Sequence, residues 1–416
     1  MTAGTPTDPP AVEQREAVTE PESLFRSVAF RWYYLGTTVS LTGSAMAPVA
    51  LAFAVLALSH RAADLGLVLA ARTVPLVAFL LLGGAVADRF PRMRVLRLSN
   101  AGAALTQGTA ATLLITHAYS LGAIMALEFL NGALSAFTMP AMRGIVPQLV
   151  PSSHQQRANS LMGSTKNAVN IFGPSLAGVT VATVGGGWAI ALDSVTYLVA
   201  AFCMTRFRVT RKITGRSSII ADIRDGWTGF RSLTWVWTVV LSLAVTNCVR
   251  SGVFGVLGPE IALHSIGASA WGVVLSARAV GVLALGLLMY RLTFTRLLAT
   301  GQTFLMLGSV PVIALGLHAP AWLLVLTTAL AGAGSGVFGP AWETSLQQHV
   351  PNEMLSRISS YDDLVSFVGV PVGQAAVGPL AAAFGDTRVA LTGGVVFLVA
   401  AFLPLLAPSV RHLRSQ

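Results

Sequence analysis

Five charged residues interrupt the apolar segments of this 416-residue chain: Arg72, Glu128, Asp193, Arg250 and Arg278. In an apolar environment a carboxyl group tends to hold a proton, whereas a neighbouring arginine favours its ionised form. A helix rises 1.5 Å per residue, which places Arg72, Glu128, Arg250 and Arg278 at similar depths below the outer ends of their segments. The chemistry that these residues could perform is the uptake and release of a proton.

Glu128 is the first candidate for that proton, because it could alternate between a protonated state and a state paired with an arginine. The alternative is a carboxylate that stays permanently paired for structural reasons. Asp193 is the second candidate, although a packed carboxyl group bonded to hydroxyls such as that of Ser194 is the favoured interpretation there. The variant Glu128→Gln separates the two possibilities for Glu128.

Other kinds of chemistry find little support in the sequence. No Gly-Lys-Ser/Thr phosphate-binding motif occurs, so ATP is not expected to drive the protein. No nucleophile, base and acid set stands at catalytic spacing, and no metal-ligand spacing is present. Cys203 and Cys248 both lie in apolar segments, where a lone thiol behaves as a small apolar residue. We therefore expect no enzyme activity, no cofactor and no metal.

The elements that hold these residues must be membrane-spanning helices. Hydrophobic residues make up 54% of the chain and charged residues 11%, whereas a soluble domain has about 25% charged residues. Backbone polar groups must be paired inside lipid, so apolar runs of about 20 residues predict helices and an all-α integral membrane protein. Twelve spans are predicted: 31–58, 66–87, 98–116, 120–140, 162–184, 187–205, 235–258, 270–290, 298–317, 321–341, 363–383 and 388–408.

The placement of the basic residues predicts the orientation. The net charge is +10, but almost all basic residues fall in segments on one side, and only Arg61 and Arg388 fall in loops on the other. This is the positive-inside pattern, and it places both termini in the cytoplasm and argues against nucleic-acid binding. The first residues contain acids and prolines without an apolar core, which indicates a disordered cytosolic tail and not a signal peptide.

Two sequence matches indicate an internal duplication. The segment from Gly66 through Arg72 is similar to the segment from Gly272 through Arg278, and residues 140–160 are similar to residues 340–360. Parallel six-helix repeats are a known plan of transporters. The predicted division is a tail at 1–24, a first six-helix bundle at 25–205, a cytoplasmic linker at 206–234, a second bundle at 235–408 and a tail at 409–416. The linker is either an amphipathic surface helix or a solvated basic segment.

A motif between the second and third spans resembles the cytoplasmic signature of the major facilitator superfamily. It contains Gly84, Asp88 and Arg89, followed by the basic residues Arg92 and Arg94. The resemblance implies that these residues form a latch that stabilises one conformation. Further segments, such as Gly173-Pro174 and Pro340-Ala-Trp342, resemble the branch that contains macrolide-efflux proteins and enterobactin-type exporters.

In this superfamily the first, fourth, seventh and tenth helices usually line the substrate cavity. The resemblance therefore implies five cavity candidates: Asn131, Asn247, Arg250, Phe129 and Tyr34. Arg72 and Arg278 occupy equivalent positions in the two repeats, which favours a scaffold role between the halves. Glu128 has no such twin, because the residue 200 positions later is Thr328.

The function that the resemblance implies is export of amphipathic small molecules, such as drugs, antibiotics or natural products, by proton antiport with alternating access. The expected partners are a small-molecule substrate, protons and membrane lipids, and the expected state is a monomer. The excess of arginine over lysine indicates a GC-rich bacterium and its plasma membrane. The alternatives are a siderophore or metabolite exporter, an uptake carrier of the same fold, and a membrane receptor that does not transport.

Overall fold

The computed structural model describes residues 24–79, 90–143, 145–207, 227–228, 230–289, 296–411 and 413, and this part of the chain contains helices and no strand. The long helices of the first half are α1 (Val28–Ser59), α2 (Ala62–Ala78), α4 (Arg92–Ile115), α5 (Leu121–Arg143), α7 (Ser152–Val184) and α8 (Gly186–Cys203). Two short helices accompany them, η1 (Leu24–Arg26) and α6 (Val146–Leu149).

The second half repeats this plan with more interruptions. Its first spanning segment comprises α10 (Thr234–Val249), the π-helix η2 (Arg250–Leu257) and α11 (Gly258–Ser265). The next are α12 (Gly267–Leu288) and a segment made of α13 (Leu297–Leu305), η4 (Met306–Gly308) and α14 (Ser309–Gly316). The last are α15 (Ala321–His349), α16 (Asn352–Phe384) and α17 (Asp386–Phe402), followed by η5 (Leu403–Leu406) and α18 (Pro408–Arg411).

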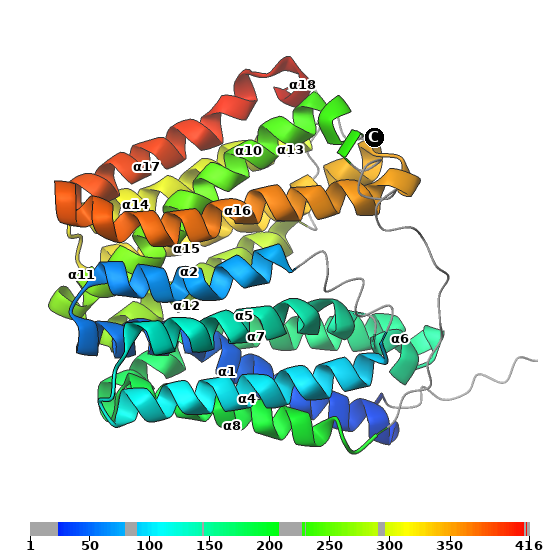
Figure 1. Cartoon of the computed structure of the whole chain (residues 1–416). Helices are drawn as coiled ribbons and strands as arrows, with labels where there is room; N and C mark the ends of the chain where they lie inside the picture. Colours follow the sequence, from blue (N-terminus) through cyan, green and yellow to red (C-terminus); the bar gives the residue numbers. More distant parts are fainter. Residues whose placement is uncertain are drawn as a thin grey trace, which may run out of the picture.

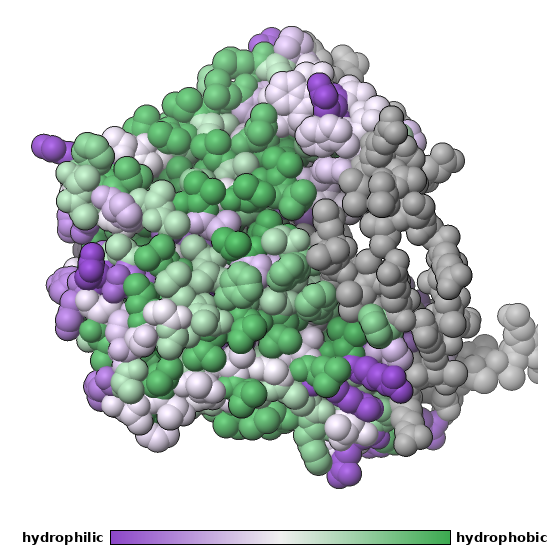
Figure 2. All heavy atoms as spheres, in the orientation of Figure 1, coloured by the Kyte–Doolittle hydropathy of each residue, from purple (hydrophilic) through white to green (hydrophobic). Residues whose placement is uncertain are grey.

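The surface of the bundle is suited to lipid. Ten helical segments in the described ranges are long and apolar enough to cross a membrane, and α2 and α4 pack among them to complete the twelve (Figure 1). Large apolar side chains face outward, including Leu98 and Leu105, which are each 72% exposed. Figure 2 shows an apolar belt around the middle of the helices and hydrophilic residues toward their ends. The predicted all-α membrane fold is confirmed.

The duplication is visible in the geometry of the helices. Helices α7 and α16 both have 33 residues and start 200 positions apart. Each ends at a glycine in the left-handed region of φ, Gly185 at 92° and Gly385 at 82°. In the first half α5 packs Gly132 against the backbone carbonyl of Arg72, and in the second half α15 packs Gly332 against that of Arg278. Equivalent residues therefore make equivalent contacts in the two halves.

The two ends of the bundle are packed differently. We call the end where α1 begins the terminal end, and the end that holds the α1–α2 and α16–α17 turns the far end (Figure 1). At the far end one apolar core joins both halves, with Leu51 and Ile190 from the first and Leu257 and Trp271 from the second. At the terminal end each half has a core of its own. Among the described residues, the halves therefore share a core at the far end and have separate cores at the terminal end.

Backbone contacts make this far-end junction close. Adding a Cβ at Gly178 of α7 would place it 2.5 Å from the carbonyl oxygen of Ala268 at the start of α12. Hydroxyls also cross the junction, since the Oγ atoms of Ser175 and Ser276 lie 2.7 Å apart. The small residues thus allow α7 and α12 to meet without a layer of side chains between them.

Several helices extend beyond the predicted spans. Helix α7 begins at Ser152 and α16 at Asn352, about one-third of a helix earlier than predicted, and α15 continues to His349. The reason is that the apolar pattern marks only the part of a helix inside lipid, while polar turns at the terminal end continue it. Residues 1–23 of the predicted tail and most of the predicted linker, 208–226 and 229, lie outside the described residues.

Candidate functional site

A cavity of about 1350 Å³ lies between the two halves. It extends from Pro259 and Trp271 toward the far end to Met289, Leu297 and Thr344 at the terminal end. A typical pocket for a drug-sized ligand has a volume of roughly 300–1,000 Å³, so this cavity has room for a large molecule. In the part of the chain that the structure describes, the two halves have separate cores at the terminal end, which favours entry of a ligand from that end.

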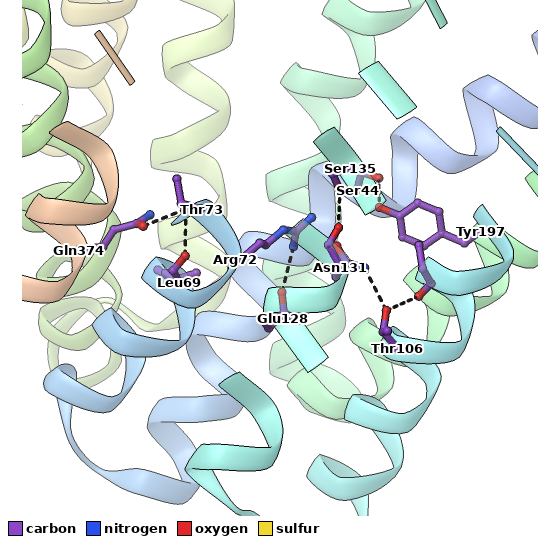
Figure 3. Close-up of polar contacts among 11 residues, drawn as sticks. Ser44, Leu69, Arg72, Thr73, Thr106, Glu128, Asn131, Ser135, Tyr197 and Gln374 are labelled. Atoms are coloured by element: carbon purple, nitrogen blue, oxygen red, sulfur yellow. Dashed lines mark hydrogen bonds and ion pairs between the residues drawn. The ribbon is translucent and has the colours of Figure 1, made fainter. Parts of the chain in front are cut away.

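An arginine and a carboxylate form a buried pair on the first-half side of the cavity. Arg72 of α2 lines the cavity, and its Nη1 lies 3.6 Å from Oε2 of Glu128 on α5. The Glu128 side chain is 1% exposed and is not among the residues that line the cavity. Figure 3 shows its carboxylate directed at the guanidinium of Arg72. Neither carboxylate oxygen makes a hydrogen bond of standard geometry with a described residue, and the neutral side chain of Gln107 interacts with the carboxylate. The arginine therefore separates the acid from the cavity.

A second acid lies near the same arginine. Asp193 of α8 is fully buried, and its carboxyl group, like that of Glu128, interacts electrostatically with Arg72. Neither of its carboxyl oxygens makes a hydrogen bond of standard geometry with a described residue. Ser194 was expected to bond it, but its hydroxyl donates to the carbonyl of Ala104 at 2.7 Å because it faces α4. The expected bond to Ser194 is therefore absent, whereas the hydroxyl of Thr196 does interact with the Asp193 carboxyl group. One arginine here faces two acids.

Hydroxyl groups extend this cluster toward α1. The hydroxyl oxygens of Ser44 and Tyr197 lie 2.9 Å apart (Figure 3), and Tyr197 also interacts with Arg72. Gly43 allows α1 to approach Asp193 and Thr196 closely, since a Cβ there would collide with both. The cluster thus links α1, α2, α5 and α8 within the first half.

The second-half side of the cavity contains two arginines and a different set of partners. Arg250 and Arg278 both line the cavity and are close enough to interact electrostatically. Arg250 donates to Oδ1 of Asn247 at 3.0 Å, and Asn247 in turn donates to the carbonyl of Ser366 at 3.1 Å. Within the described ranges, neither arginine forms a salt bridge with an acid. Asn247 lines a smaller pocket of about 180 Å³ beside Arg250.

Four of the five predicted cavity residues do not line the large cavity, and one of them, Asn247, lines the smaller pocket. Asn131 is fully buried on α5 and its amide donates to Thr106 of α4 at 3.4 Å. Phe129 is 42% exposed on the outer face of the same helix, because successive helical residues point about 100° apart. The Tyr34 hydroxyl lies 2.8 Å from Thr165 Oγ1 in the terminal part of the first half. These residues lie on the predicted helices, but their side chains do not lie on the helix faces that line the cavity.

Other polar residues, which were not predicted from the sequence, do line the cavity. Asn167 and Asn170 of α7 lie one turn apart on the wall, and Pro174 follows one turn later. Thr73 of α2 donates to Oε1 of Gln374 of α16 at 2.9 Å, a hydrogen bond between the halves (Figure 3). The spacing of 167, 170 and 174 fits one face of a helix, and this signal could have identified α7 as a lining helix.

Of the predicted latch, Gly84, Asp88 and Arg89 lie outside the described residues. Arg92 is the first residue of α4, and Arg94 is exposed near the start of the same helix. The latch therefore stays a prediction. Its two described residues, Arg92 and Arg94, flank Met93, which belongs to the core of the first half at the terminal end.

Comparison with known proteins agrees with this architecture. Residues 19–415 match the family described as transmembrane secretion effector, MFS_3. The multidrug efflux pump Tap of Mycolicibacterium fortuitum is 26% identical over 386 residues, covering 88% of this chain and 93% of Tap. The enterobactin exporter EntS of Citrobacter koseri is 25% identical over 401 residues, covering 93% and 94%.

Two solved structures have the same fold. A point mutant of the nucleoside transporter NupG superposes with a TM-score of 0.76 at 12% identity, over 91% of this chain and 99% of NupG. An inward-facing, unoccupied bacterial homologue of the lysosomal transporter Spinster gives 0.72 at 15% identity, over 95% and 98%. The chain therefore belongs to the transmembrane secretion effector family and is a multi-pass transporter of the major facilitator superfamily.

Proposed function

We propose that this protein exports amphipathic small molecules from the cytoplasm in exchange for protons. The observation that carries the proposal is the cavity between the halves, which opens toward the terminal end and is lined by apolar residues and three arginines. With both termini in the cytoplasm, as the positive-inside pattern predicts, this is the inward-facing state that loads a cytosolic substrate. The protein then acts as a monomer in a bacterial plasma membrane.

Charge counting supports the proton as the coupling ion. Glu128 and Asp193 share one nearby cation, Arg72, and the side chains of Gln107 and Thr196 that interact with them are neutral. A buried carboxylate without a partner is costly, so the two acids together are expected to hold one proton. Because Arg72 stands between Glu128 and the cavity, rearranging Arg72 changes how well the acids are paired. A substrate in the cavity that moves Arg72 would therefore change the proton affinity of the two acids.

The alternating cycle follows from the packing of the two ends. The separate cores at the terminal end let the halves approach each other there while the shared core at the far end divides. Export is favoured over uptake because Tap and EntS, which match most of this chain, are named as exporters. A siderophore exporter is the second candidate, and the similarity to EntS is the observation that favours it.

The test uses bacterial cells that lack their own efflux pumps and express this chain. Efflux of ethidium, N-phenyl-1-naphthylamine and 8-anilinonaphthalene-1-sulfonate is followed with and without an uncoupler. We expect uncoupler-sensitive efflux of at least one compound, and its loss in Glu128→Gln and Asp193→Asn because either change fixes the charge of the cluster. Glu343→Gln, an exposed acid at the terminal end, is the control. Full uncoupler-sensitive efflux by Glu128→Gln would contradict the proposed coupling.

A further inference from the structure

The internal duplication gives Arg278 a place that is equivalent to that of Arg72. The backbone carbonyl of Arg72 packs against Gly132, and that of Arg278 packs against Gly332. The residue four positions before each of these glycines lies one helical turn away, on the side of the helix that carries the glycine. In the first half this residue is Glu128, and in the second it is Thr328. The second half therefore has the arginine and lacks the acid.

The position of the missing acid is polar and has space beside it. Thr328 is 1% exposed, and its hydroxyl has no hydrogen-bond partner among the described residues. It lines the smaller pocket together with Asn247, Arg250 and Arg278. Arg250 and Arg278 also line the large cavity, so the two spaces adjoin at the arginines. A buried hydroxyl without a partner, next to two cations, is arranged to receive an oxyanion.

Local structure holds Arg250 in place for this contact. It is the first residue of the π-helix η2, an irregularity that is frequent at functional sites. Its guanidinium is bonded to Asn247, which is itself anchored on the backbone of α16. One nitrogen of Arg250 is thus fixed, and its remaining donors stay available to a ligand.

We propose that the anionic group of the exported molecule, a carboxylate, sulfonate or phosphate, binds between Arg250 and Arg278 beside Thr328. The proposal rests on the export function and names the class of substrate: an amphipathic anion or zwitterion whose apolar part lies against Trp271, Phe254 and Leu275 of the large cavity. The ligand's oxyanion supplies to the second half the negative charge that Glu128 supplies to the first.

The test compares two dyes with the same aromatic skeleton, 8-anilinonaphthalene-1-sulfonate, which is an anion, and N-phenyl-1-naphthylamine, which lacks the sulfonate. Binding to the purified protein in lipid nanodiscs is measured by energy transfer from tryptophan, with empty nanodiscs as the blank. No proton gradient is involved. A failure here is therefore distinguishable from a failure of the efflux experiment.

Four variants and one control decide the outcome. Arg250→Gln and Arg278→Gln are each expected to weaken the sulfonate dye roughly tenfold or more while changing the neutral dye little, since a hydrogen bond to a charged group is lost. Thr328→Glu supplies the missing acid and is expected to weaken the sulfonate dye at least as much, whereas Thr328→Gln, similar in size but uncharged, is not. Arg388→Gln, an exposed arginine of α17, leaves both dyes unchanged.

Two results would overturn the proposal. One is that the ratio of the affinities for the sulfonate dye and the neutral dye stays unchanged in Arg250→Gln and Thr328→Glu. This comparison is informative even if Arg278→Gln fails to fold. The other is displacement of the sulfonate dye by chloride or inorganic phosphate as effectively as by an equal concentration of naphthalene-1-sulfonate, which would assign the site to a free inorganic anion.

Discussion

Arg72 is the cation nearest to two buried acids, so its removal is the most informative single change. At the observed separation of 3.6 Å from Glu128, two unit charges attract by about 4–5 kcal/mol at the effective dielectric constant of about 20 that suits protein sites. Breaking a buried pair from one side typically costs about 3–5 kcal/mol. We expect Arg72→Gln to lower the free energy of unfolding by about 3–5 kcal/mol.

Replacing Glu128 should lower the free energy of unfolding less than replacing Arg72, because Arg72 has a second acid nearby. In Glu128→Gln, Arg72 still has Asp193 nearby, so we expect a loss of about 1–3 kcal/mol. In the double variant Arg72→Gln/Glu128→Gln only one acid stays without its cation. The double variant should therefore be more stable than Arg72→Gln alone, so the coupling energy should exceed the loss of about 1–3 kcal/mol expected for Glu128→Gln.

These quantities can be measured by titrating the purified protein from mild detergent into sodium dodecyl sulfate and following tryptophan fluorescence. Arg388→Gln, which removes an exposed arginine, is the matched control. If Arg72→Gln costs no more than Arg388→Gln, or if the two changes are additive, the argument that Arg72 neutralises the buried acids is refuted.

Two further predictions concern glycines. Gly178→Leu should force α7 away from Ala268 and open the far end, so that a cysteine introduced at Leu275 reacts with a membrane-impermeant maleimide added outside cells. The control is Gly122→Leu, because Gly122 has open space around it. Equal labelling in the two variants would contradict the close junction between α7 and α12. Gly185→Ala and Gly385→Ala should each lower the free energy of unfolding in the same titration by about 1–3 kcal/mol, because the backbone at φ 92° and 82° with ψ near 150° is accessible almost only to glycine. Gly122→Ala should cost nothing, and a similar loss there would remove the conformational explanation.

Much of the fold could be predicted from the sequence. The apolar runs indicated the helices because lipid allows few alternatives, and the repeated segments around Arg72 and Arg278 indicated the duplication. The depth of the charged residues also placed Arg72 and Glu128 at one level, and the structure pairs them. These features depend on position along a helix axis, which a sequence records directly.

The direction of side chains around each helix was harder to predict. Asn131 and Phe129 were both assigned to the cavity, yet one is buried against α4 and the other is exposed. In a membrane protein the lipid-facing side is as apolar as the interior, so the usual contrast between the two faces of a helix is weak. The hydrogen bond between Thr73 and Gln374 joins residues about 300 positions apart, and nothing local in the sequence indicates it.

The shared core at the far end has a thermal consequence. Apolar side chains from both halves meet there, including Leu51 and Trp271, and opening this end exposes part of their surface to water. Hydration of apolar surface raises the heat capacity, so the equilibrium between the two states should give a curved van't Hoff plot. Since hydrophobic contacts weaken on cooling, lower temperature should shift the population toward the state whose cavity faces the outside.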